Sequence, residues 1–168
     1  MRKKKVLFIC THNSARSQMA EALLKHIAGN MFEVESAGFK AGVLNPLAVE
    51  VMREIDIDIS RNETKSIWVL YRQGHHYDYV ITVCSESEAA ECPIFPGVSK
   101  QIHWWLADPA SFQGTEEDKL RKTREIREQI RIKIEEWVVE ICMKSATFSP
   151  ALVPIGGLKD DITEEETI

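Results

Sequence analysis

A cysteine and an arginine enclose a short polar segment near the start of the chain. Five residues separate Cys10 from Arg16, and a loop of this length can turn several backbone N–H groups toward one anion. Arg16 adds a planar fork that matches two oxygens of the same anion. Such a positive surrounding favours the thiolate form of Cys10, so the segment predicts a nucleophile for a tetrahedral oxyanion. The expected anion-binding residues are Thr11, His12, Asn13, Ser14, Ala15, Arg16 and Ser17.

The alternative interpretation is a buried cysteine that ends a strand before an ordinary helix cap. The spacing to Arg16, the polar Asn13 and Ser14, and the strand–loop–helix context all favour the functional interpretation instead.

Three further cysteines follow. Cys84 ends a strongly apolar run, and seven polar or small residues separate it from Cys92. That gap is longer than the roughly 2–4 residues of a zinc knuckle, which argues against zinc. For Cys84 alone a structural thiol is a fair alternative, but Cys92 lies in an acidic, exposed-looking stretch. We expect Cys142, on a long helix, to pack rather than to do redox chemistry.

The hydrophobic pattern predicts the elements that position these residues. Apolar runs predict strands over residues 5–9, 32–36, 77–83 and 101–105. Helical spacing and caps predict helices over residues 17–28, 46–55 and 64–72, and a long helix that begins after Thr115. The alternation predicts an α/β fold: a small parallel sheet of about four strands, with helices on both faces. In such sheets ligands lie at the carboxyl ends of the strands.

Length and charge limit the organisation. The chain has 168 residues, which indicates one domain over residues 1–145, and the pattern ends in a flexible acidic tail over residues 146–168. The net charge is −5, and most of it lies in that tail. Because the rest of the domain is nearly neutral, we expect it to bind neither nucleic acid nor membranes. The apolar run behind the basic start is too short for a signal peptide, and we expect a cytoplasmic protein.

The sequence resembles a known family. Residues 6–21, Val-Leu-Phe-Ile-Cys-Thr-His-Asn-Ser-Ala-Arg-Ser-Gln-Met-Ala-Glu, resemble the active-site loop of the low-molecular-weight tyrosine phosphatase superfamily. The Ser-Gln-Met-Ala-Glu continuation is most similar to its thioredoxin-coupled arsenate reductases. The resemblance covers roughly residues 4–140 and extends through Ser36-Ala-Gly38, Asn45-Pro46, Cys84, Cys92-Pro93 and Asp108-Pro109.

This resemblance implies a role for each thiol and for one acid. Cys10 would attack arsenate, and Asp108 would be the general acid that protonates the departing oxygen. Cys84 would then attack Cys10 with release of arsenite, and Cys92 would attack Cys84, which leaves a disulfide for thioredoxin. Seven residues separate the last two cysteines here, against six in most members.

Further expectations concern the segment between these cysteines and the bound groups. A helix over residues 84–92 would hold its ends ~12 Å apart, whereas a disulfide needs Cα atoms within about 7 Å. The segment must therefore unwind during the cycle. The resemblance also implies a monomer without a tightly bound cofactor, and a possible potassium site at Asn13, Glu21 and Ser36.

Two rival functions remain open. A low-molecular-weight protein tyrosine phosphatase needs only Cys10, Arg16 and Asp108. Relatives that act on phosphotyrosine carry aromatic residues just after the Asp-Pro pair, whereas Ala110 and Ser111 follow here, which favours a small inorganic oxyanion. A non-catalytic thiol module for arsenite or a soft metal would leave Arg16 and Asp108 without a task.

Overall fold

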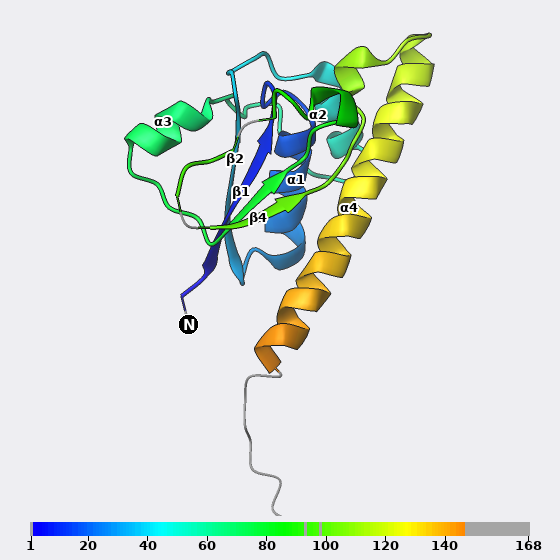
Figure 1. The fold of residues 1–168 in the computed structure, drawn as a ribbon. Helices are drawn as coiled ribbons and strands as arrows, with labels where there is room; N and C mark the ends of the chain where they lie inside the picture. The colour runs from blue at the N-terminus through cyan, green and yellow to red at the C-terminus, as the bar shows by residue number, and fades with distance from the viewer. Residues whose placement is uncertain (1, 93, 98, 147–168) are drawn as a thin grey trace, which may run out of the picture.

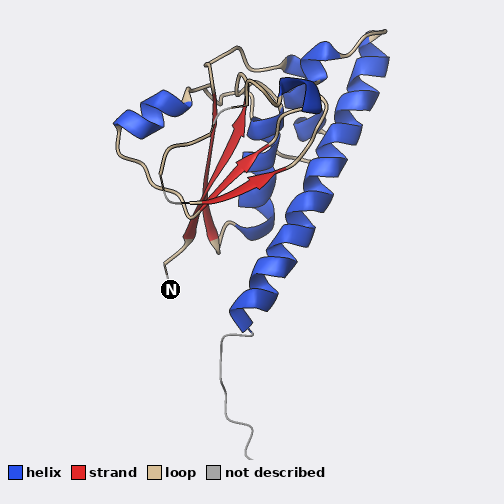
Figure 2. Ribbon diagram, in the orientation of Figure 1, coloured by secondary structure: helices blue, strands red, loops and turns tan. Residues whose placement is uncertain are grey.

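Strand β1 (Lys4–Cys10) lies at the centre of the fold because it pairs with two neighbours. In this computed structural model, which describes residues 2–92, 94–97 and 99–146, β2 (Phe32–Gly38) and β3 (Tyr79–Thr82) flank it, and β4 (Lys100–His103) pairs with β3. All four strands are parallel, in the order β2-β1-β3-β4 (Figures 1 and 2). The predicted α/β fold with a four-stranded parallel sheet is therefore confirmed.

The two faces of the sheet pack against different elements. On one face Val6 and Phe8 join the core formed with α1 (Arg16–Ala28) and α4 (Glu116–Ala146). On the other, Leu7 and Ile9 pack with residues of the short helix α3 (Ile67–Arg72). Because successive side chains of a strand alternate between faces, the unbroken apolar run of β1 is buried on both.

The helix caps follow the predicted local signals. Asn45 accepts a hydrogen bond from the N–H of Leu47 at the start of α2 (Pro46–Arg53). Thr115 and Asp118 cap α4 reciprocally, and this helix packs on α1 and α2 (Figure 1). Its buried stripe is the predicted one: Ile126, Ile130, Ile134, Trp137 and Ile141.

The predicted boundaries differ in places. Helix α3 begins at Ile67 rather than at residue 64, because Thr64 and Lys65 bond instead to the backbone of Gly42 and the side chain of Asn13. Strand β3 is shorter than residues 77–83, although the N–H groups of residues 78 and 83 still donate to β1. Helix α2 ends near residue 53, and β4 ends at residue 103.

The carboxyl-terminal boundary stays a prediction. Helix α4 continues through Ala146, and the predicted acidic tail falls almost wholly on residues 147–168, outside the described residues. Within the part of the chain that the structure describes, no helix is both long and apolar enough to cross a membrane.

Candidate active site

The loop between β1 and α1 turns its carbonyl groups outward. The carbonyl oxygens of residues 10, 11, 12 and 14 accept hydrogen bonds from one neighbouring segment, whose donors are the N–H groups of Phe39, Lys40, Gly42 and Asn45, at 2.8–3.1 Å. On the inner side of the loop, the N–H of Asn13 donates to Cys10 Sγ at 3.1 Å. This loop, called the cup below, has the form expected of an anion site: its carbonyls are bonded outside it, and it lies at the start of α1, where the helix dipole adds positive potential.

Two residues make this tight loop possible. Asn13 has a left-handed backbone with φ of 55°, which asparagine tolerates better than most residues. Gly38 lies directly beneath the loop, since a Cβ there would come within 2.6 Å of the Asn13 nitrogen. The buried Asn13 side chain ties the loop to α1, to β2 and to the segment before α3, through hydrogen-bond partners at Ser17, Gln18, Ser36 and Lys65.

Cys10 lies at the base of the cup. It is a free thiol, 2% exposed, at the carboxyl end of β1. The N–H of Asn13 donates to its Sγ at 3.1 Å, and the Ser17 hydroxyl lies 2.9 Å from the same sulfur. These two contacts hold the Cys10 sulfur at the base of the cup, at the start of α1.

Arg16 points its guanidinium to the rim of the cup. It is only 3% exposed and donates to the carbonyl oxygen of Leu106 at 3.1 Å. Burial by itself would lower the pKa of Arg16. The hydrogen bond with Glu88 and the negative charges of Cys10 and Asp108 outweigh it, so the pKa is raised. The arginine therefore stays charged, and in this structure its partners are the carboxylates of Glu88 and Asp108.

Asp108 reaches the same rim from the loop after β4. Its carboxylate lies 3.5 Å from Arg16 Nη2, and its other oxygen accepts from the N–H of Ala110 at the start of the short 3₁₀ helix η2 (Pro109–Ser111). Pro109 is buried and holds this turn. The structure thus brings the predicted acid and the predicted arginine together, although they lie 92 positions apart in the sequence.

Cys84 and Cys92 form a disulfide with a Cα–Cα distance of 6.5 Å. Cys84 is fully buried and lies just after β3, whose Thr82 pairs with Ile9 of β1. Cys84 and Cys10 therefore lie at the ends of two neighbouring strands. Between the two cysteines the chain forms only one 3₁₀ turn, η1 (Glu86–Glu88). In this disulfide state the segment is not a continuous helix, as the spacing argument required.

The sequence reasoning missed Glu88. Its carboxylate meets both Nη atoms of Arg16, at 2.7 and 3.0 Å, and accepts from the hydroxyl of Thr11 at 2.8 Å. Burial would raise the pKa of Glu88, but the hydrogen bonds from Arg16, Ser85 and Thr11 hold it far below its ordinary value. The available signal was the Ser-x-x-Glu pattern of residues 85–88, which forms a capping box.

The remaining predicted residues take lesser places. His12 is exposed, and Ser14 and Ala15 contribute backbone groups to the loop and the helix start. The expectation that Cys142 packs is wrong, since it is exposed while Ile141 takes the inward position on α4. One step along a helix turns a side chain by about 100°, which carries Cys142 away from the core.

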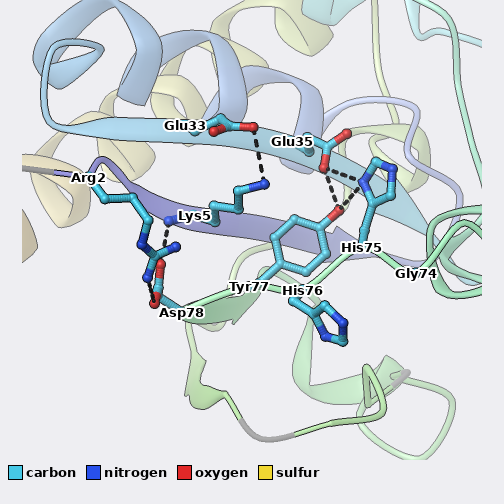
Figure 3. A pocket seen from close by; sticks show the side chains of 9 residues that line it. All are labelled: Arg2, Lys5, Glu33, Glu35, Gly74, His75, His76, Tyr77 and Asp78. Carbon is cyan, nitrogen blue, oxygen red and sulfur yellow. Dashed lines mark hydrogen bonds and ion pairs between the residues drawn. The ribbon is translucent and has the colours of Figure 1, made fainter.

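A polar hollow lies near the start of β1, away from Cys10 (Figure 3). There the Glu35 carboxylate accepts a hydrogen bond from the Tyr77 hydroxyl and lies 3.0 Å from His75 Nδ1. Burial, together with the bond to Glu35, raises the pKa of Tyr77. Among the described residues no cluster of three His, Cys, Asp or Glu side chains could hold a metal ion. We therefore assign no chemistry to this hollow.

Comparison with known proteins decides the family. Residues 5–146 match the family model of low molecular weight phosphotyrosine protein phosphatase. The chain belongs to this family.

Its similar relatives include enzymes of two kinds. An arsenate reductase of Oceanobacillus iheyensis is 43% identical over 138 residues, 80% of this chain and 96% of that protein. A solved thioredoxin-dependent arsenate reductase of Corynebacterium glutamicum has a TM-score of 0.61 and 33% identity, over 84% of this chain and 63% of that one. A low molecular weight protein tyrosine phosphatase from T. tengcongensis has a TM-score of 0.64 and 25% identity, over 82% and 99%.

Proposed function

We propose that this protein reduces arsenate to arsenite with three cysteines. One observation carries the proposal: the Cys84–Cys92 disulfide follows a strand beside the one that ends at Cys10, and the loop after Cys10 leads to Arg16, which lies 3.5 Å from Asp108. A phosphatase needs the loop, the arginine and Asp108 but has no use for that redox pair. The similarity to arsenate reductases at about 43% identity supports the same choice.

The first step uses the cup. Arsenate would occupy the N–H groups of the cup and the guanidinium of Arg16, with arsenic in front of Cys10 Sγ. The thiolate forms an S–As bond while Asp108 gives a proton to the departing oxygen, which leaves as water. The product is a thiol–arsenate adduct on Cys10, with arsenic still in its oxidised state.

The second and third steps move electrons outward. The thiolate of Cys84 attacks Cys10 Sγ and forms an S–S bond, and the electron pair of the S–As bond leaves with arsenic as arsenite. Cys92 then attacks Cys84, which frees Cys10 and forms the Cys84–Cys92 disulfide. Cys84 is fully buried and Cys92 is only half-buried, so the last disulfide is accessible from the Cys92 side.

A dithiol reductant must complete the cycle. We propose thioredoxin, which supplies two electrons and two protons to the Cys84–Cys92 disulfide and becomes oxidised itself. The thioredoxin-dependent relative supports this choice. We further propose that the protein acts as a monomer in the cytoplasm, where such reductants keep thiols reduced.

Potassium binding at Asn13, Glu21 and Ser36 stays a prediction, and the hydrogen bonds of these three side chains give it little support. Ser36 donates to Glu21 and accepts from the amide nitrogen of Asn13, while the ammonium of Lys25 already pairs with Glu21. The Asn13 oxygen is occupied by two donors. These side chains hold the loop by hydrogen bonds rather than form a cage of free oxygens, so we derive no step through a cation.

The test is a coupled assay that follows NADPH oxidation with arsenate, thioredoxin and thioredoxin reductase. The wild type should turn over many times. Cys84→Ser and Cys92→Ser should each lose multiple turnover yet still bind phosphate, while Cys142→Ser should behave as the wild type because Cys142 lies outside the relay. Full multiple turnover in both Cys84→Ser and Cys92→Ser would refute the relay.

The same variants separate the rival function. Hydrolysis of an aryl phosphate needs only Cys10, Arg16 and Asp108 and should survive the loss of Cys92. A much higher kcat/KM for phosphotyrosine peptides than for arsenate would assign the protein to the phosphatases. Stoichiometric metal retained by the purified protein, with no reductase activity, would point to a thiol module instead.

A further inference from the structure

Glu88 binds the Arg16 guanidinium, which the oxyanion also needs. Its two carboxylate oxygens face the two terminal nitrogens of Arg16, at 2.7 and 3.0 Å, in the bidentate geometry by which arginine binds carboxylates and tetrahedral anions alike. Thr11, the first residue of the cup, donates its hydroxyl to the same carboxylate at 2.8 Å. The internal carboxylate thus takes the place at Arg16 that two oxygens of arsenate would take.

An oxyanion and this carboxylate exclude each other. The two terminal nitrogens of Arg16 can form a bidentate pair with only one anion at a time. A bound oxyanion and the Glu88 carboxylate would also repel each other at contact distance in a buried site. Arg16 is 3% exposed, so water gives little screening there. For an anion to bind Arg16 fully, Glu88 must first leave.

The position of Glu88 is tied to the disulfide. The residue lies between Cys84 and Cys92, and the bond between them holds the segment in a short turn with a Cα–Cα distance of 6.5 Å. Within this turn Glu88 also accepts from the N–H of Ser85 at 2.7 Å and from its hydroxyl, so its carboxylate is aimed by local bonds as well. Opening the disulfide removes the covalent constraint that shapes this turn.

We propose that Glu88 competes with the oxyanion for Arg16, and that it wins while the Cys84–Cys92 disulfide is closed. Reduction of the disulfide by a dithiol, which yields the two Cys thiols and the oxidised reductant, releases the segment and opens Arg16 to the substrate. The proposal rests on the proposed function, since it deepens the redox cycle of that site.

This competition has a chemical use. If arsenate entered while Cys84 was still in the disulfide, Cys10 would form an adduct that no free Cys84 thiol could resolve. A carboxylate that fills Arg16 in the oxidised state prevents that dead end. It also displaces any anion left on Arg16 once the relay is complete.

The test measures binding of inorganic phosphate by calorimetry, in a Cys142→Ser background that avoids disulfides between molecules. Each protein is compared with its Cys84–Cys92 disulfide closed and reduced. With Glu88 present, the closed form should bind phosphate about tenfold more weakly or worse, the size expected for one charge-assisted pair. Glu88→Gln should bind phosphate nearly equally in both states, because it removes the charge and keeps the shape.

Glu86→Gln is the matched control, since Glu86 lies in the same turn, is exposed, and should keep the full redox difference. NMR of the Arg16 guanidinium in the Glu88 protein gives a second readout that does not depend on a variant's folding. Phosphate should shift these signals strongly only in the reduced form. Equal phosphate affinity in the two redox states, or a full difference retained by Glu88→Gln, would overturn the proposal.

The binding assay needs no arsenate turnover, so it tests the role of Glu88 independently of the proposed arsenate reduction. A protein that cannot reduce arsenate but binds phosphate in this redox-dependent way would refute the proposed function and support the role of Glu88. A protein that reduces arsenate and binds phosphate equally in both states would do the reverse.

Discussion

The backbone N–H of Asn13 donates to the sulfur of Cys10 across 3.1 Å. Asn13 itself has a left-handed backbone, with φ of 55°, within the tight turn that places its N–H over the end of the preceding strand. The contact to the nucleophile is therefore made by the main chain, and the Asn13 side chain serves to hold that main chain in place.

Replacing Asn13 should separate these two contributions. Asn13→Gly keeps access to positive φ but leaves buried partners unsatisfied, and we expect it to cost about 1–3 kcal/mol of unfolding free energy. Asn13→Ala should lose roughly 1–2 kcal/mol more, because alanine is strained at this φ. Urea unfolding measures both variants. Equal stability of the two variants would show that the left-handed backbone is not strained here.

Gly38→Ala should weaken phosphate binding as well as stability. The added Cβ would meet the Asn13 nitrogen and the Lys40 oxygen at 2.6 Å, so the cup must shift. Gly74→Ala is the control: its φ is 74°, yet a Cβ there meets no atom within 4 Å. It should lose about 1 kcal/mol from backbone strain alone and bind phosphate normally. Calorimetry with phosphate distinguishes the two variants, and normal binding by Gly38→Ala would contradict the fit described here.

Asp108→Asn should lower kcat with little change in phosphate affinity. An amide cannot give the proton that the departing oxygen needs, and losing a general acid costs roughly 10²–10⁴-fold in rate. The rate of aryl phosphate hydrolysis at saturating substrate measures the effect. Asp58→Asn, an exposed acid outside the site, should leave it unchanged. A kcat within twofold of the wild type for Asp108→Asn would remove Asp108 from the proton-transfer step.

Glu54 should make stability depend on pH. It ends α2 and pairs with Arg124 and with the buried Arg127 of α4. The hydrogen bond from Arg124, with the further contact to Arg127, lowers the pKa of Glu54 below its ordinary value of 4.5. A carboxylate whose pKa is lowered on folding stabilises the protein above the unfolded pKa, and this contribution is lost as pH falls through the folded value.

We therefore expect Glu54→Gln to lose about 1 kcal/mol at neutral pH, and this deficit to shrink as the pH falls below 4.5. Urea unfolding at several pH values gives the difference directly. Glu50→Gln, which removes a pair with Arg53 on the exposed side of α2, should show almost no deficit at any pH. A Glu54→Gln deficit that stays constant down to strongly acid pH would contradict the linkage.

The parts of the site that could be predicted are those encoded locally. The strand before Cys10, the loop and the helix that begins at Arg16 lie in one continuous stretch, and each has its own pattern. Asp108 was found through the Asp-Pro pair and a resemblance to known proteins. The predicted pairing of Cys84 with Cys92 likewise came from that resemblance, and the structure contains the disulfide.

The parts that were missed depend on contacts between distant segments. Glu88 meets Arg16 across 72 positions, and its neighbours indicate only the local cap with Ser85, not the distant arginine. The start of α3 was misplaced for the same reason, since the N–H of Lys65 donates to Asn13 instead of opening a helix. Cys142 was misassigned because it follows the buried Ile141 in the sequence, although one step along a helix turns the side chain by about 100°.

The row of hydrogen bonds from residues 39–45 to the cup makes the loop observable from outside. The four donor N–H groups, at Phe39, Lys40, Gly42 and Asn45, all end on carbonyls of a single turn. If the turn opens, these four protons lose their acceptors together, and their exchange with solvent should speed up as one cooperative unit. Four backbone amides that touch no substrate can thus serve as a gauge of how often the nucleophile's loop is intact.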